Sequence, residues 1–199
     1  MIGQRNVYGY IGGSDANRLY GSFETKTFKD FWNERLTGIK LNEFNTNDTA
    51  VGNIMEHRVM DELGIDPAYR DIFVKKEGTI AGINTDALTP DAYDEIKTAL
   101  PKLPYKWLNG RAISVNYRRQ LMHGLYVTGR ILGRLHVLPM TEQEKKNPFG
   151  LNIKGRVVTF EFEVKDFNME EHHRRIMYLT KCFSEKIQPT DGGLKKYRV

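Results

Sequence analysis

The chain has 199 residues, of which 40% are hydrophobic and 28% charged, a composition typical of one globular domain with a buried core. No stretch approaches the roughly 20 apolar residues of a membrane-spanning helix, and the N-terminus "MIGQRNVYGY" lacks the apolar run of a secretory signal. We therefore expect a cytoplasmic protein without a membrane partner. The formal charge of +5 permits a nucleic-acid partner without requiring one, and the single cysteine excludes an internal disulfide.

Three helices are predicted in the first third of the chain. Ser14 and Asp15 are N-cap candidates for a short helix that closes at Gly21. The segment "TFKDFWNERLTG" has apolar residues at helical spacing and ends at Gly38, after which the polar stretch "LNEFNTND" predicts a loop. A third helix is predicted over "DTAVGNIMEHRVMDELG", with Asp48 or Thr49 as its cap.

The third helix carries an apolar stripe with an acidic residue beside it. Glu56 lies next to the stripe, and Gly52 lies one turn earlier on the same face, where it leaves room for a group to approach the carboxylate. The stripe consists of Val51, Ile54, Met55, Val59 and Leu63.

Strands are predicted at 72–77, 79–86 and 92–98, and the "LTPD" turn joins the last two as a hairpin. Strand alternation then places Glu95 and Lys97 on one face, roughly 6.5–7 Å apart, with Ile96 on the other. Asp86 ends the preceding strand close by.

The second half of the chain predicts further helices and strands. A loop over 100–110 leads to a helix at 113–128, and two strands, "RILGRLHVLP" and "RVVTFEFEVKD", flank a polar loop over 140–152. A long helix over 168–187 carries Cys182, whose thiol we expect to be packed rather than reactive. We expect Asn168 and Glu171 to form a capping box at its start and 188–199 to be a mobile basic tail. The fold class is α/β, with a central mixed sheet flanked by helices.

Three acidic residues indicate a metal site. Glu56, Asp86 and Glu95 would form an oxygen-rich pocket of the kind that Mg²⁺ or Mn²⁺ prefers, and the Ile96 carbonyl could add a ligand. Lys97 would lie beside a metal-bound water and a scissile phosphate, so these parts suit phosphodiester hydrolysis. The structural alternative is that Glu95 and Lys97 are a surface pair and that Asp86 is an ordinary turn residue.

Other polar groups support weaker hypotheses. The basic cluster of Tyr117, Arg118 and Arg119 is a candidate for DNA contact, although a solvated helix face explains it equally well. His172 and His173 are adjacent on a helix and diverge by about 100 degrees, which disfavours a shared metal. His57 and His123 could approach the acidic trio, but surface or packing roles are favoured.

Four motifs in register resemble the phage lambda exonuclease and YqaJ-like recombinase family of PD-(D/E)XK nucleases. They are "IGGSD" at 11–15, "GNIME" at 52–56, "TDALTPDAYDEIKT" at 85–98 and "YRRQLMHGLYVTG" at 117–129. The resemblance implies a restriction-endonuclease-like core, a single nuclease domain over 1–199, and metal binding by Asp86 and Glu95. It also implies that Lys97 is the catalytic lysine, Glu56 the acidic residue of the helix and Gln120 a residue that positions the water or the lysine. Ser14 would contact a terminal phosphate.

Two positions depart from the family pattern. Ala87 stands where the family has a glycine after the aspartate, which changes the hairpin backbone but leaves the ligand. Val7 stands where an arginine would hold a 5′ phosphate, seven residues before Ser14, and Arg5 is the nearest basic residue.

The resemblance implies a Mg²⁺- or Mn²⁺-dependent 5′–3′ exonuclease of phage recombination type that acts on ends of double-stranded DNA. A ring-shaped trimer and a single-strand annealing protein as partner are implied with it, in the host cytoplasm if the chain is phage-encoded. An endonuclease on the same core and a catalytically silent DNA-binding or assembly module are the alternatives.

Overall fold

The computed structural model describes residues 9–39, 47–108 and 112–199. Its centre is a four-stranded sheet in the order β3-β4-β5-β6. The strands are β3 (Ala87–Leu88), β4 (Ala92–Ala99), β5 (Leu132–Pro139) and β6 (Val158–Glu163). β4 and β5 are parallel, whereas the other two pairings are antiparallel, so the sheet is mixed as expected. A separate hairpin pairs β1 (Phe73–Lys75) with β2 (Gly82–Asn84).

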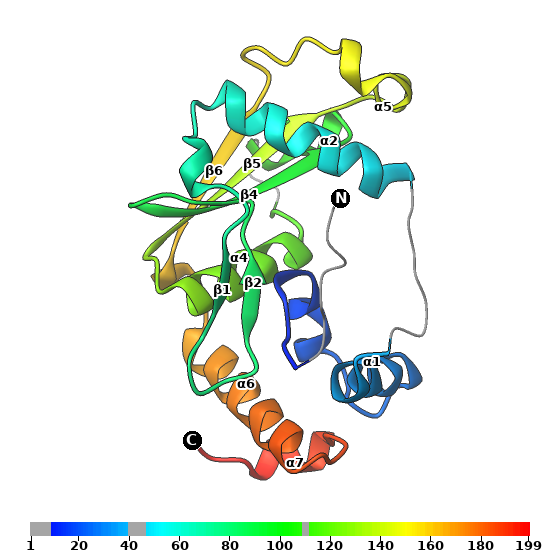
Figure 1. Cartoon of the computed structure of the whole chain (residues 1–199), viewed down its shortest axis with the longest axis vertical. Coiled ribbons are helices and arrows are strands. Elements are labelled where there is room, and N and C mark those ends of the chain that lie inside the picture. The colour runs from blue at the N-terminus through cyan, green and yellow to red at the C-terminus, as the bar shows by residue number, and fades with distance from the viewer. Residues whose placement is uncertain (1–8, 40–46, 109–111) are drawn as a thin grey trace.

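The helices form two layers about this sheet (Figure 1). α2 (Asn47–Glu62) covers one face, where its side chains share a hydrophobic core with Ile96 and Leu138. α4 (Val115–Thr128) covers the other face, and α6 (Met169–Ser184) packs beyond it. A 3-10 helix (Gly13–Tyr20) lies beside the β1–β2 hairpin, and α1 (Lys26–Thr37) lies on the far side of that 3-10 helix; α7 (Asp191–Lys196) follows α6 at the C-terminal end.

Local capping explains where the main helices begin and end. The side chains of Thr25, Ser114 and Asn168 accept backbone N–H groups at the starts of α1, α4 and α6. Gly38 and Gly129 adopt left-handed conformations, with φ of 75° and 71°, at the ends of α1 and α4. These three predicted helices and the apolar stripe of α2 are confirmed.

The strand expected at 79–86 is wrong in extent. Only Gly82–Asn84 is a strand, it belongs to the second sheet, and the hairpin partner of β4 is Ala87–Leu88. The chain leaves the first pairing at Thr85, whose Oγ1 donates to the Ile72 carbonyl. Asp86 then accepts the Ile96 N–H with its side chain, so a carboxylate replaces a backbone partner at this edge.

Two segments expected to be loops contain helices. α3 (Lys102–Leu108) forms within the predicted loop at 100–110 because Pro104 lies in its first turn, where a helix needs no N–H donor. α5 (Glu142–Lys146) forms within the loop at 140–152 through a capping box between Thr141 and Glu144, and a 3-10 turn at Pro148–Gly150 follows.

The C-terminal segment and the first helix also differ from expectation. Residues 188–199 are not a free tail in this structure, because Leu194 is buried and the Asp191 carboxylate binds the Ser22 hydroxyl at 2.5 Å. The first helix is capped by Gly12 rather than by Ser14 or Asp15, because the Asp15 carboxylate turns back to accept the Gly12 N–H.

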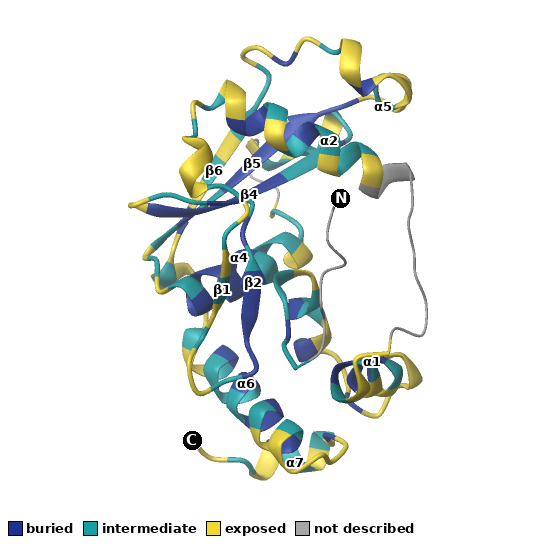
Figure 2. Cartoon of the chain, viewed as in Figure 1, coloured by how far each residue is buried: buried dark blue, intermediate teal, exposed yellow. Residues whose placement is uncertain are grey.

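Buried residues are concentrated on the central strands and on the inward sides of α4 and α6, whereas α5 and β1 have none (Figure 2). Cys182 is fully buried within α6, as expected of a packed thiol, and burial raises its pKa. In the described part of the chain no helix is both long and apolar enough to span a bilayer.

Candidate active site

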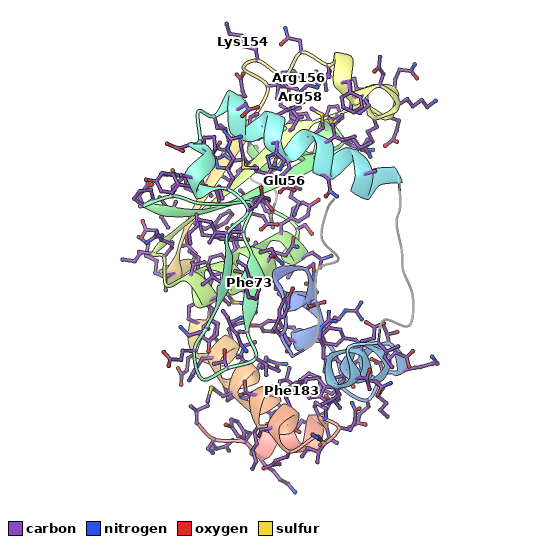
Figure 3. All side chains as sticks on the ribbon, viewed as in Figure 1. Glu56, Arg58, Phe73, Lys154, Arg156 and Phe183 are labelled. Carbon is purple, nitrogen blue, oxygen red and sulfur yellow. The ribbon has the colours of Figure 1, made fainter. Side chains whose placement is uncertain are left out.

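A polar cavity of about 460 Å³ opens between α2, the 3-10 helix and the strands β2 and β4. Glu56 reaches it from α2, on the side of that helix that faces the rest of the chain (Figure 3). Its lining includes Tyr10, Gly12, Gly13, Ser14, Asp15, Arg35, Asn53, Glu56, Ile83, Asn84, Asp86, Glu95, Lys97 and Gln120. Six residues predicted to form the site therefore meet in one place: Ser14, Glu56, Asp86, Glu95, Lys97 and Gln120.

Glu95 and Lys97 point to the same side of β4, as alternation predicts. Lys97 Nζ lies 2.5 Å from Glu95 Oε1, and the second oxygen of Glu95 accepts the Tyr93 hydroxyl. Glu95 is 6% exposed, so this is a largely buried ion pair rather than the surface pair of the structural alternative. Ile96 faces the other way, into the core beneath α2.

Asp86 joins this pair from the start of the hairpin. Its Oδ2 accepts the Ile96 N–H at 2.6 Å. Because the N–H and C=O of a strand residue lie on the same edge of the strand, the Ile96 carbonyl also faces the Asp86 side. The carboxylate and the carbonyl are therefore placed as neighbouring oxygen donors.

The electrostatics of the cavity favour a cation. Burial, followed by repulsion from Glu95, raises the pKa of Asp86 well above its usual value, with a further contribution from Glu56 and partial relief by Lys97. Burial alone would lower the pKa of Lys97, but Glu95 and Asp86 outweigh it, so that pKa is raised. Four carboxyl groups but only two cationic groups, Arg35 and Lys97, line the cavity.

The donor set fits a hard divalent cation, since carboxylate and carbonyl oxygens are the ligands that Mg²⁺ and Mn²⁺ prefer. In the conformation of the described residues, no three acidic, histidine or cysteine side chains form a ready-made ligand set. Both oxygens of Glu95 are engaged by Tyr93 and Lys97. A bound ion would therefore compete with the Lys97–Glu95 pair for this carboxylate.

The close approach of α4 to β4 depends on Gly124, one turn after Gln120. A Cβ at this position would lie 2.1 Å from Cε1 of Tyr93, which is fully buried. We expect Gly124→Ala to lower the free energy of unfolding by about 1–3 kcal/mol, because Tyr93 has nowhere to move. Urea denaturation measures this. Gly52→Ala is the control: no atom lies within 4 Å of its Cβ, so it should be neutral or stabilising, and equal losses in the two variants would contradict the packing argument.

Tyr117, Arg118 and Arg119 are not part of the cavity lining, although Tyr117 is close enough to Lys97 to contribute to its raised pKa. Arg118 donates to the Asp166 carbonyl and covers the rings of Phe162 and Phe167, while Arg119 covers the ring of Tyr20. Tyr117 packs edge-on against Trp107. Arg5 lies outside the described residues.

No described histidine lines the cavity that holds Glu56, Asp86 and Glu95. His123 is fully buried, with Nε2 against the Ile11 carbonyl at 3.0 Å and Nδ1 against His172 at 3.2 Å, and burial lowers its pKa. This is the packing role that was favoured. His57 lies 3.4 Å from Asp71 near the surface.

Sequence reasoning missed Arg35, which is 7% exposed and belongs to the cavity wall. Its Nη2 lies 2.9 Å from Asp15 Oδ2, and its Nε has no hydrogen-bond partner among the described residues. A signal was present, because Phe28, Phe31, Trp32 and Arg35 follow one helical stripe, and a charged residue on an apolar stripe needs a buried partner. Tyr10, Asn53 and Asn84 were also missed, and no comparable pattern marks them.

Comparison with solved structures identifies the fold. LHK-Exo, an alkaline exonuclease from Laribacter hongkongensis, matches in its complex with dAMP at a TM-score of 0.69 and 12% identity, over 90% of each chain. A phage-related exonuclease from Haemophilus somnus 129PT matches at a TM-score of 0.65 and 12% identity, over 91% of this chain and 96% of that chain. This chain has the fold of these exonucleases. The mixed α/β fold expected from the sequence is thus confirmed and is shared with these exonucleases, whereas neither the protein-family models nor the curated proteins give a match.

Proposed function

We propose that this chain is a metal-dependent deoxyribonuclease, a single domain over 1–199 that hydrolyses DNA phosphodiesters as a 5′–3′ exonuclease at duplex ends. One observation carries the proposal. Glu56 of α2, Asp86 just before β3, and Glu95 and Lys97 of β4 line one cavity in a fold shared with solved exonucleases. Unrelated surface charges would be neither buried nor clustered, whereas burial and then repulsion from Glu95 raise the pKa of Asp86.

The roles follow from chemistry. Asp86, Glu95 and the Ile96 carbonyl would hold Mg²⁺ or Mn²⁺, with Glu56 as a further acidic ligand. When bound, the ion lowers the pKa of a water and neutralises charge on the phosphate. Lys97, held in its charged form by Glu95, stabilises the negative charge that develops as the phosphate is attacked. Gln120 would orient the water or the lysine.

The substrate end would lie against the wall formed by Gly13, Ser14 and Arg35. The Ser14 hydroxyl would contact a terminal phosphate, and Arg35 would supply a cation on the same wall. In the sequence, Val7 stands at the position where the family has an arginine. Arg5, Tyr117, Arg118 and Arg119 would contact the DNA backbone outside the cavity.

The family resemblance also supports a biological role, a partner protein and an oligomeric state. We propose a role in phage-type recombination, in the cytoplasm of a host cell, where the single strands produced would pass to an annealing protein. A ring-shaped trimer around the DNA would account for processive digestion, and sedimentation measurements on the purified protein would test it.

A linear duplex and a closed circular plasmid, each incubated with Mg²⁺, test the proposed activity. We expect release of nucleotides from the linear duplex and no change in the circle, and a label at the 5′ or 3′ end, with or without 5′ phosphate, gives the polarity. Cleavage of the closed circle would support the endonuclease alternative. DNA binding without cleavage of either substrate would support the silent binding module.

A further inference from the structure

An aromatic pair stands beside the candidate active site without belonging to the hydrophobic core. Phe73, the first residue of β1, is 49% exposed, and its ring centroid lies 5.2 Å from that of Tyr10 at an interplanar angle of 60°. Tyr10 lines the cavity, and so does Asn84, the residue paired with Phe73 across the hairpin. Figure 3 labels Phe73 on the hairpin and Glu56 on α2 above it. We call Tyr10 and Phe73 the aromatic platform.

Strand β2 holds the aromatic platform in place. Both rings lie over Gly82 of β2, where a Cβ would be 3.3 Å from Tyr10 Cδ2 and 3.3 Å from Phe73 Cζ. Asn84 Nδ2 lies 3.4 Å from the Tyr10 hydroxyl. The strand thus supports the rings from below, while half of the Phe73 surface remains open to solvent.

The chemistry of the cavity indicates what covers the open surface. The groups that suit a phosphate are polar and charged, and none of Ser14, Arg35, Asn53 or Gln120 offers a flat apolar surface to a nucleobase. Tyr10 is the aromatic ring in that lining, so a base attached to a phosphate in the cavity would find its stacking surface on the Tyr10 side. Aromatic side chains beside the path of a nucleic-acid strand are a usual stacking surface for unpaired bases, whatever their sequence.

We propose that the aromatic platform stacks on an unpaired nucleobase of the substrate strand, next to the phosphate that enters the cavity. This inference rests on the proposed nuclease function and adds a surface that holds the base. Stacking with the ring of Phe73 is worth a factor of about 5–150 in binding, the range found for base–aromatic contacts.

Steady-state hydrolysis of duplexes with a single abasic site tests the proposal. The site is placed at each of the three terminal positions of the digested strand, and kcat/KM is measured for the wild type and Phe73→Ala. At one of these positions, removal of the base should lower kcat/KM of the wild type about 5-fold or more. Phe73→Ala should have a kcat/KM lowered by the same factor on normal DNA, and the abasic site should lower it no further. Phe73→Tyr should behave like the wild type.

Two controls separate stacking from packing. Phe149→Ala removes an even more exposed phenylalanine, 74% exposed and outside the cavity lining, and should leave kcat/KM unchanged. Phe73→Leu keeps apolar volume over Gly82 but loses the ring face, so full recovery by leucine would overturn the proposal. Equal abasic effects in the wild type and Phe73→Ala would overturn it as well. The absence of any hydrolysis by the wild type would instead refute the proposed function on which it rests.

Discussion

Lys97→Met should lower kcat for DNA hydrolysis by about 10²–10⁴-fold, the usual loss on removing a positioned charge or proton-transfer group from an active site. Nζ of Lys97 is 2.5 Å from Glu95, whereas Arg35, the other described cation in the cavity lining, pairs with Asp15, so the charge of Lys97 has no described substitute beside Glu95. Single-turnover hydrolysis of an end-labelled duplex measures the effect, because it excludes product release from the measured rate.

In Lys97→Met, an effect on the stability of the fold has to be separated from an effect on the rate of hydrolysis. Removal of one partner leaves the Glu95 carboxylate largely buried with Tyr93, and an uncompensated buried charge destabilises a protein. Lys97→Met with Glu95→Gln removes both charges, so its melting temperature should recover towards the wild-type value. If activity recovered with stability, Lys97 would have only a structural role.

Asp86→Asn should abolish the response of the protein to divalent cations and raise its melting temperature in their absence. The folded-state pKa of Asp86 lies above the unfolded value of about 3.9, so the folded chain retains a proton that the unfolded chain has released. The contribution of Asp86 to stability is therefore lost as pH rises from about 4 through the folded pKa. Asparagine removes this loss and keeps an oxygen for the Ile96 N–H.

Thermal melts of the wild type and Asp86→Asn between pH 4.5 and 8, in EDTA and then in Mg²⁺, check this prediction. In EDTA the stability advantage of asparagine should grow with pH. Mg²⁺ should stabilise the wild type by mass action and leave the variant unchanged. If the wild type were more stable than Asp86→Asn at pH 8 in EDTA, burial and repulsion from Glu95 would not be destabilising the charged Asp86 carboxylate as argued.

The acidic trio and the lysine could be predicted because each lies in a short, regular pattern. Strand alternation alone places Glu95 and Lys97 together and Ile96 opposite, and the apolar stripe of α2 fixes the side of the helix from which Glu56 projects. The fold class followed from the order of strands and helices. Long amphipathic segments are the most reliable part of such a prediction because burial of one face decides their structure.

The rest of the site depends on contacts between distant segments. Arg35 meets Asp15 only after α1 packs beside the 3-10 helix, and no local pattern specifies that pairing. The extent of β2 was mispredicted because the Asp86 side chain takes the Ile96 N–H that a longer antiparallel strand would have bonded. The short helices were missed because capping by Thr141 and the first-turn position of Pro104 outweigh a polar, proline-bearing composition.

Hydrolysis of a linear DNA duplex by the purified protein, in Mg²⁺ and in EDTA, tests the central claim most directly. The wild type should release nucleotides in Mg²⁺ and none in EDTA, and Asp86→Asn purified in the same way should release none in either buffer. A folded wild type that leaves DNA intact in both Mg²⁺ and Mn²⁺, or an Asp86→Asn variant that digests DNA as fast as the wild type, would contradict the account.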